Sequence, residues 1–423
     1  MPMTPRFVQI SRRLAFVMLA GAAHLSVAAA APPVSFETPT PRPATDVLPA
    51  ELLRGPHFTV SPMVQNLGYM NAYTVNSDFG LFSANGDAML RRLIREIAAI
   101  AALREIRGSE AFTSALGQAA MGSARGLKYA VTEPVATLKA VPQSIFDVFG
   151  RTQETLSRKK TRYEDSSVKA ALQVSSNKRD YAAKLGVDVY STNPVLQQEL
   201  NSVGWAATGG QLTLGAATIA AGGPVAQGLS YARNLDQARS IVAAEPPPAL
   251  VKRNRAALTT MDVNRERAEH FLAHREFSPR HQTLIVAALG QLNGVRGRGN
   301  FLTVAETAPS EEMALFYQQM AELLAGYHAT VAPIARLEPF NRLVIAYRKD
   351  GTPVIIAPVD YAIWSQSVAK GVDGLAQRLP NLPSSKPLEL WITGIASPSF
   401  KTAAAARKIA VHEKISTTIA LLD

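Results

Sequence analysis

The chain of 423 residues contains no cysteine, and this limits how a fold of its length can be held together. No disulfide framework, thiolate nucleophile or cysteine metal site can form. The tertiary structure must therefore rest on noncovalent burial of apolar side chains, and a chain of this length can bury a sizeable core. A hydrophobic content of 47% against 18% charged residues predicts a globular protein rather than a disordered one.

The first 31 residues have the layout of a secretory signal peptide. Three arginines, Arg6, Arg12 and Arg13, precede an uncharged run that ends in small residues at Ala31. A positive segment, an apolar segment and a small-residue cleavage site are the parts of such a signal. We therefore expect an exported protein, periplasmic or extracellular. A single anchored helix is an alternative for which the run is short, and the paired arginines also fit a twin-arginine route.

Prolines and changes in hydrophobic period divide the remaining chain. Residues 32–56 carry seven prolines and predict an extended tether. Residues 57–244 predict a β-hairpin followed by a helical domain, which the proline run after Glu245 closes. Residues 249–335 predict a helical region, and residues 338–423 predict a small α/β module. The expected fold class is therefore α+β, predominantly α-helical.

Local signals place the main elements of the N-terminal and central regions. Alternating apolar residues within 57–86 predict the hairpin, and apolar spacings of three and four residues predict a helix over 87–106. Asn193 followed by Pro194 is a capping residue before proline at a first helical position. Further helices are expected near 250–276, 279–292, 302–308, 310–327 and 365–378.

Near Leu337 the hydrophobic period changes from that of a helix to that of a strand. Two strand-like runs, 342–347 and 354–357, flank a turn at Asp350-Gly351. A strand over 388–392, a helix that starts at Ser397-Pro398 and a strand over 409–411 then follow. Strand, helix and strand in this order predict a parallel pair with a right-handed crossover.

The formal net charge is +11, and it is +8 without the first 31 residues, which carry three arginines and no acidic residue. An exported chain of this charge predicts weak attraction to anionic lipid, lipopolysaccharide or acidic polymer. Most lysines and arginines are dispersed, and the tight clusters lie at 158–162 and 252–255. Neither cluster is interleaved with the aromatic residues of a nucleic-acid platform, so nucleic acid is not an expected partner. An anionic envelope surface or a protein is the expected kind of partner.

The tract over residues 200–232 is unusual because no charged residue occurs between Glu199 and Arg233. It is rich in alanine, glycine and threonine, and small residues let two helices approach closely in water or in lipid. Three interpretations stay open. The tract is a buried and tightly packed helix pair, a site of peripheral membrane contact, or a flexible loop.

Three histidines are the candidate metal ligands. His270 and His274 are four residues apart, so on a helix both project from one face, and His281 can return from the next helix as a third zinc ligand. Phe271 stands where a zincin motif would place its glutamate. Surface or helix-end histidines explain the same pattern. No catalytic residue and no cofactor-binding motif is identified.

Three further segments have the chemistry of a binding site. The basic loop over 294–299 has the pattern to grip an acidic partner or to be a solvated loop. Gly394 to Ser397 joins a strand to a helix N-terminus, where backbone N–H groups hold anions and where Ser397 can also cap the helix. Asp360-Tyr361, with Trp364 close by, lines a cleft or joins a buried aromatic cluster.

These observations favour an exported, envelope-associated binding or scaffolding protein of unknown ligand, without a catalytic motif. The alternative is an exported hydrolase, metal-assisted through His270, His274 and His281. It is kept because catalytic groups converge from distant positions and leave no local motif. The sequence gives no Gly-x-Ser-x-Gly nucleophile elbow to support it.

The export hypothesis predicts where the mature chain begins. N-terminal sequencing of the protein from an envelope fraction should find a start within a few residues of Ala31. Recovery of an intact Met1 on cytoplasmic protein would contradict export. Replacing Arg12 and Arg13 together with lysine separates the two routes, because it should block a twin-arginine route and barely affect Sec export.

Overall fold

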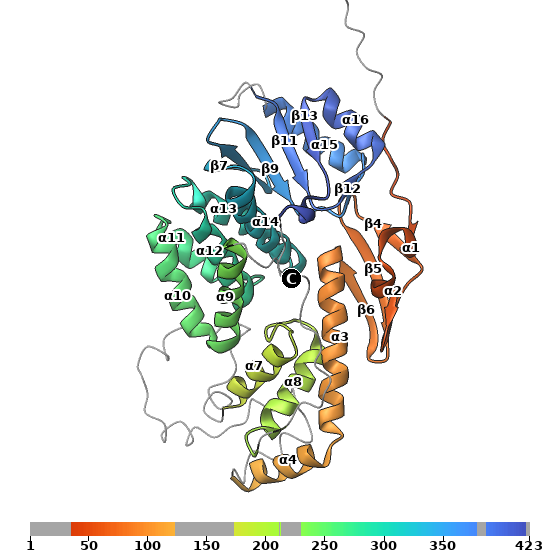
Figure 1. Ribbon diagram of the computed structural model, residues 1–423, viewed down its shortest axis with the longest axis vertical. Helices are drawn as coiled ribbons and strands as arrows, with labels where there is room; N and C mark the ends of the chain where they lie inside the picture. The colour runs from red at the N-terminus through yellow and green to blue at the C-terminus, as the bar shows by residue number, and fades with distance from the viewer. Residues whose placement is uncertain (1–34, 123–172, 211, 213–229, 379–385, 420–423) are drawn as a thin grey trace, which may run out of the picture. The chain divides into compact units, whose positions relative to one another are not determined.

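The computed structural model describes residues 35–122, 173–210, 212, 230–378 and 386–419. Over these residues the fold is α+β and mainly helical, with one sheet towards the N-terminus and another towards the C-terminus (Figure 1). The fold class predicted from the sequence is therefore confirmed. The predicted signal peptide lies outside the described residues.

The N-terminal sheet is antiparallel and is built around β5. Its strands are β1 (Arg42–Pro43), β2 (Arg54–Gly55), β3 (Phe58–Val60), β4 (Met63–Asn66), β5 (Asn71–Ser77) and β6 (Gly80–Asn85). Strands β3 and β4 pair with successive parts of β5, and β6 pairs with β5 as well. Along β5, Tyr73 and Val75 are buried while Thr74 is exposed. The alternation of buried and exposed residues that predicted a hairpin is therefore present, but the strands form a larger sheet than one hairpin.

Part of the predicted proline-rich tether is folded onto this sheet. Residues 42–55 form β1, the short helices α1 (Ala44–Val47) and α2 (Ala50–Leu53), and β2. Pro43 and Pro49 directly precede these two helices, a place where a missing N–H group costs no helical hydrogen bond. Ala44 is buried and its N–H donates to the Pro62 carbonyl at 2.7 Å. The prolines thus start helices here instead of keeping the chain extended.

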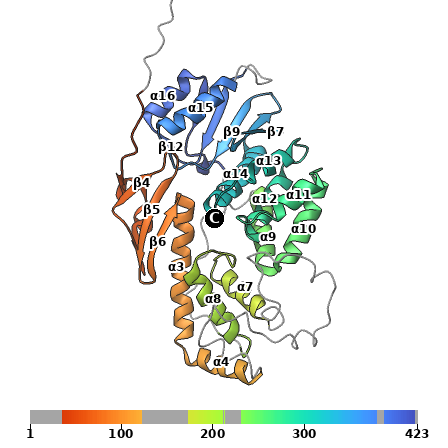
Figure 2. The ribbon, with the colours of Figure 1, turned by 180° about the vertical axis from the view of Figure 1, so that it is seen from behind.

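Helix α3 (Asp87–Arg107) runs along the N-terminal sheet and continues into a helical body (Figure 2). Its first half packs Leu90 and Ile97 against the sheet, and its second half packs Ile100 and Leu103 among helices. The apolar spacing of three and four residues that predicted this helix is therefore confirmed. The neighbouring helices are α4 (Glu110–Gly122), α7 (Val174–Lys184), α8 (Pro194–Ala206) and α9 (Ser230–Ala244).

Helix α8 begins where the sequence predicts. The Asn193 side chain accepts hydrogen bonds from the backbone N–H groups of Val195 at 3.1 Å and Leu196 at 3.3 Å. A Cβ atom at Gly204 would lie 3.1 Å from the Val174 carbonyl oxygen, so the glycine lets α7 and α8 approach closely.

The uncharged tract is described at 200–210, 212 and 230–232, and residues 213–229 lie outside the described part. Where it belongs to α8, its apolar side chains Leu200, Val203 and Ala206 are buried in the helical core. None of the helices in the described part of the chain combines the length and apolar character that crossing a membrane requires.

A second group of helices follows the proline run. They are α10 (Pro247–Thr260), α11 (Arg265–Leu272), α12 (Pro279–Gln291), α13 (Arg298–Ala305) and α14 (Glu311–Thr330). The single helix expected over 250–276 is two helices. Asp262 adopts a left-handed backbone with a φ of 57°, and the Asn264 side chain caps α11 by accepting from the Glu266 N–H at 2.8 Å. The capping preference of asparagine overrides the apolar period at this point.

The C-terminal sheet has the strand order β13-β11-β9-β8-β7. Its strands are β7 (Ile334–Phe340), β8 (Leu343–Arg348), β9 (Pro353–Ala357), β11 (Leu388–Ile392) and β13 (Ile409–His412). Strands β11 and β13 are parallel, as predicted, and β9 is parallel to β11 as well. Helices α15 (Gln366–Arg378) and α16 (Pro398–Ala406) connect the three strands. A small parallel pair, β10 (Tyr361–Ala362) and β12 (Ile395–Ala396), follows the ends of β9 and β11. The last element is η5 (Ile415–Thr417).

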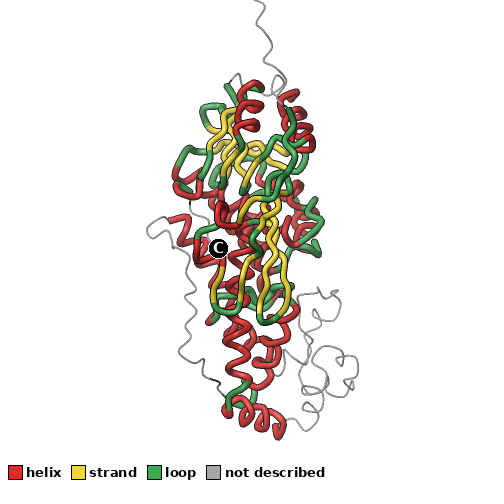
Figure 3. Tube along the Cα trace, turned by 90° about the vertical axis from the view of Figure 1, so that its right-hand side faces the viewer, coloured by secondary structure: helices red, strands yellow, loops and turns green. Residues whose placement is uncertain are grey.

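The central helices and the C-terminal sheet share one core. A single cluster of buried apolar residues extends from Ala232 in α9 to Ile419. Helix α14 is at its centre, since its residues from Ala314 to Tyr327 are all buried. Figure 3 shows the strands of this sheet gathered apart from those of the N-terminal sheet, with helices around both. The region over 338–423, expected as a small α/β module, is built against the preceding helices.

A largely buried arginine, whose side chain is 12% exposed, joins α3 to two distant segments. The Arg92 guanidinium contacts Glu96 at 3.2 Å, Glu311 at 2.9 Å and Asp188 at 3.6 Å. Burial alone would lower the pKa of Arg92, but the three carboxylates raise it above its ordinary value. Burial also raises the pKa of Glu311. The cluster ties α3 to the segment before α8 and to the first turn of α14.

Removing this guanidinium should destabilise the protein. We expect Arg92→Ala to lower the free energy of unfolding by about 3–5 kcal/mol, because it leaves buried carboxylates without their cation. Urea unfolding followed by circular dichroism measures the change. The matched control is Arg265→Ala, an exposed arginine, with an expected change within about 0.5 kcal/mol. Equal unfolding midpoints for the two variants would contradict a structural role for the cluster.

Candidate functional site

His270 lies on α11 and His274 lies two residues beyond its end, so the expected placement of both on one helix face is wrong. Both histidines contact Glu306, which directly follows α13. His270 Nδ1 lies 2.9 Å from a Glu306 carboxylate oxygen, and His274 Nε2 donates to the Glu306 carbonyl oxygen at 3.0 Å. His274 Nδ1 accepts the Glu276 N–H at 3.3 Å, so both of its ring nitrogens are engaged. These contacts fasten α11 to α13 and account for the two residues as helix-end histidines.

His281 lies in the first turn of α12 and is fully buried. The Phe277 ring packs edge-on against both His274 and His281, with ring centroids 5.3 Å and 6.4 Å away. Within the described ranges, no group of three or more His, Asp or Glu side chains is arranged to hold a metal ion. The structure therefore brings His270 and His274 together on Glu306, while a phenylalanine ring lies between His274 and His281.

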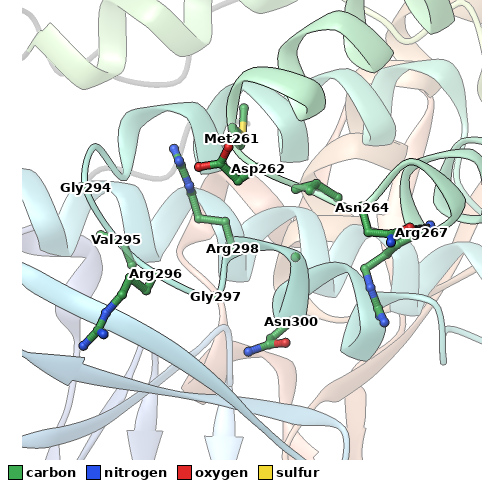
Figure 4. Close-up of a pocket in the computed structure, with 12 residues that line it drawn as sticks. Met261, Asp262, Asn264, Arg267, Gly294, Val295, Arg296, Gly297, Arg298 and Asn300 are labelled. Carbon is green, nitrogen blue, oxygen red and sulfur yellow. Dashed lines mark hydrogen bonds between the residues drawn. The ribbon is translucent and has the colours of Figure 1, made fainter.

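A cavity of about 430 Å³ opens beside the basic loop that the sequence singled out (Figure 4). One wall is the turn between α10 and α11, from Met261 to Asn264, together with Arg267 on α11. The other wall is the loop over residues 294–297 and the start of α13, from Arg298 to Asn300. Sequence reasoning identified this loop but missed the facing turn, because it treated residues 250–276 as one helix. Asn264 before Arg265-Glu266 was the capping signal that would have found it.

The loop is held against the edge of the C-terminal sheet. The Arg296 N–H donates to the Ala335 carbonyl at 3.0 Å, and the Leu337 N–H donates to the Arg296 carbonyl at 2.9 Å. Gly297 follows with a φ of +78°, and a Cβ there would lie 2.4 Å from the Leu337 carbonyl oxygen. Only glycine fits this backbone and this close approach to β7. The basic loop is thus an extension of the sheet.

The cavity is strongly cationic. Its lining includes Arg267, Arg296 and Arg298, against one carboxylate, Asp262. Figure 4 shows Arg298 extending towards the Met261–Asp262 turn, while Arg296 extends the other way. Helix α13 begins in the cavity wall, and Gly297 at its N-cap supplies no capping side chain. Its first N–H groups add partial positive charge to that of the guanidinium groups.

One hydrogen-bond donor among the three pocket arginines has no acceptor in the described part of the chain. The Arg298 Nε atom is buried and has no hydrogen-bond acceptor among the described residues. A buried N–H without an acceptor is costly, and an oxygen of a bound anion would remove that cost. The pocket therefore has the chemistry to hold a small anionic group through guanidinium hydrogen bonds.

The predicted anion site at Ser397 is filled by the chain itself. The Glu37 carboxylate accepts the Ser397 hydroxyl at 2.6 Å and the Trp364 N–H at 2.5 Å, and Ser397 caps α16 by accepting the Phe400 N–H at 3.0 Å. Trp364 is buried and packs edge-on against Phe400. Aromatic packing, not a cleft wall, is therefore the role of Trp364.

The comparisons with known proteins give no relative: no family model, no curated protein and no solved structure matches this chain.

Two glycines of the loop allow its shape to be tested. Gly294→Ala should cost about 1–2 kcal/mol of stability, because its φ of +72° is left-handed but a Cβ there meets nothing within 4 Å. Gly297→Ala should cost more, because it adds the clash with the Leu337 carbonyl to the same backbone strain. Thermal unfolding midpoints compare the two variants. Equal losses would show that the loop is not fixed against β7.

Proposed function

We propose that the protein is an exported, envelope-associated binding protein that recognises an anionic group in the arginine-lined pocket, without catalysis of its own. The observation that carries this proposal is the buried Arg298 Nε, a donor without an acceptor among the described residues, in a cavity lined by three arginines. The signal-like first 31 residues support the proposed location, and the net charge of +8 carried by the rest of the chain supports the sign of the ligand.

Arginine, rather than lysine, lines the pocket, and this bears on the ligand class. A guanidinium presents its donors in a planar fork that matches carboxylate and phosphate oxygens. A cavity of about 430 Å³ is within the range of small-molecule sites, so it suits a compact anion or one charged group of a larger partner. The anionic headgroups and acidic polymers of a cell envelope carry such groups.

Peripheral membrane contact through residues 200–232 is a separate proposal from anion binding in the arginine pocket. The described part of the tract in α8 is packed among helices, which favours the core interpretation for those residues. Envelope association through the arginine pocket does not depend on this tract. The two sources of association are therefore separable by substitution.

The alternative function, an exported hydrolase assisted by a metal at His270, His274 and His281, has weaker support. His270 and His274 are engaged by Glu306, and the Phe277 ring packs against His281. No observation in the described part of the chain adds a nucleophile or a water-activating group to the three histidines. The binding hypothesis accounts for more of the site.

A titration with inorganic pyrophosphate tests the pocket. We expect the protein to bind this anion at low salt, and Arg298→Met to raise the dissociation constant about tenfold or more, because a charge-assisted hydrogen bond is worth about 1.5–3 kcal/mol. Isothermal titration calorimetry measures both constants. The matched control is Arg265→Met, which removes an exposed arginine from the helix that carries Arg267. Wild-type protein that binds no pyrophosphate, or equal constants for the two variants, would refute the proposal.

A further inference from the structure

A carboxylate from the C-terminal sheet region lies at the first turn of α3. Asp360 follows β9, and its Oδ2 accepts the N–H groups of Asn71 at 2.9 Å and Asp87 at 3.2 Å. Backbone bonds join the same segments, since the Asp360 N–H donates to the Tyr69 carbonyl at 3.0 Å. The contact thus connects the turn between β4 and β5, and the start of α3, to a segment more than 270 residues later.

A second carboxylate shares this contact. Asp87 Oδ1 accepts the side-chain N–H of Asn71 at 3.0 Å and the Tyr73 hydroxyl. Asn71 therefore donates through its backbone to Asp360 and through its side chain to Asp87. Two carboxylates held this close repel one another when both are ionised, and one retained proton removes that repulsion.

The other charged groups around the pair do not cancel this repulsion. On α3, Arg91 faces Asp360 but is itself exposed to solvent, which screens it. From β1, Arg42 donates to Asn71 Oδ1 at 3.3 Å and stacks on the Tyr361 ring at 4.0 Å. From β5, Tyr73 stays neutral, because burial and the charge of Asp87 raise its pKa well above the ordinary value.

We propose that this contact is a pH-dependent clasp, which holds the start of α3 and the β4–β5 turn tightly to the segment after β9 when Asp87 and Asp360 retain one proton between them, and loosens when both are ionised. The proposal rests on the shared Asn71 and on the convergence of two carboxylates from different elements. It is independent of the anion pocket.

The direction of the pH dependence follows from Asp360. Burial, and then the charge of Asp87, raise the pKa of Asp360 from 3.8 to about 7. A carboxyl group whose pKa is raised by closing the contact stabilises it fully below pH 3.8. That stabilisation is lost as the pH rises to about 7 and changes little beyond. The clasp is therefore tighter at pH 5 than at pH 8.

Hydrogen exchange tests the clasp at its own donors. The measurement is the exchange rate, by mass spectrometry, of peptides that contain the Asn71 and Asp87 N–H groups. Asp360→Asn keeps a side-chain oxygen as acceptor but cannot ionise. Dividing the wild-type rate by the Asp360→Asn rate in the same buffer cancels the intrinsic effect of pH on exchange. We expect this ratio to rise at least about tenfold from pH 5 to pH 8.

Two further variants keep the test decisive. Asp87→Asn removes the repulsion but leaves Asp360 buried, so its exchange ratio should rise from pH 5 to pH 8 by less than that of the wild type. It replaces Asp360→Asn as the comparison if circular dichroism shows that variant unfolded. Asp46→Asn, at an exposed carboxylate of α1, should keep the full wild-type pH response. A ratio that stays within about twofold between pH 5 and pH 8 overturns the proposal.

Discussion

The arrangement of the described chain depends on the pairing of one largely buried guanidinium. Arg92 on α3 meets carboxylates from α3 itself, from the segment before α8 and from the start of α14. A charge out of water is tolerated only when it is paired, so these segments must meet in an arrangement that satisfies all of them. Helix α14 is in turn the centre of the largest core. The position of α3 is thereby tied to that of the C-terminal sheet.

Much of the fold is predictable from local sequence signals. The helix over 87–106 and the parallel strands near 388–392 and 409–411 follow from hydrophobic period, and Asn193 marks a helix start through its side chain. Such signals act over a few residues, where covalent geometry sets the spacing. The break at Asp262 was missed because a capping asparagine interrupts an apolar period that continues on both sides of it. The folding of residues 42–55 was missed because prolines that predict an extended chain start short helices there.

Of the two walls of the candidate site, one could be predicted from the sequence and the other could not. The basic loop is visible as a pattern of glycine and arginine, but the facing turn at Met261–Asn264 is brought to it by the packing of α10 and α11. Polar contacts between distant segments produce no regular pattern of residues by which the sequence alone could reveal them. Glu96 with Ser191 and Asp360 with Asn71 are of this kind, and each is specified by a folded environment. The sequence-based hypothesis of a binding protein accordingly offered the basic loop as a ligand site but not the turn that faces it.

The hydrogen bonds of Glu37 have a consequence for the order in which the chain can mature. Glu37 is among the first described residues, and its carboxylate is bound by Trp364 and Ser397, 327 and 360 positions further along the chain. A polypeptide that emerges from a ribosome or a translocation channel with its N-terminus first must wait for almost its whole length before this contact can close. The leading end of the chain is therefore fastened last, and until then the carboxylate that will cover the start of α16 remains in water.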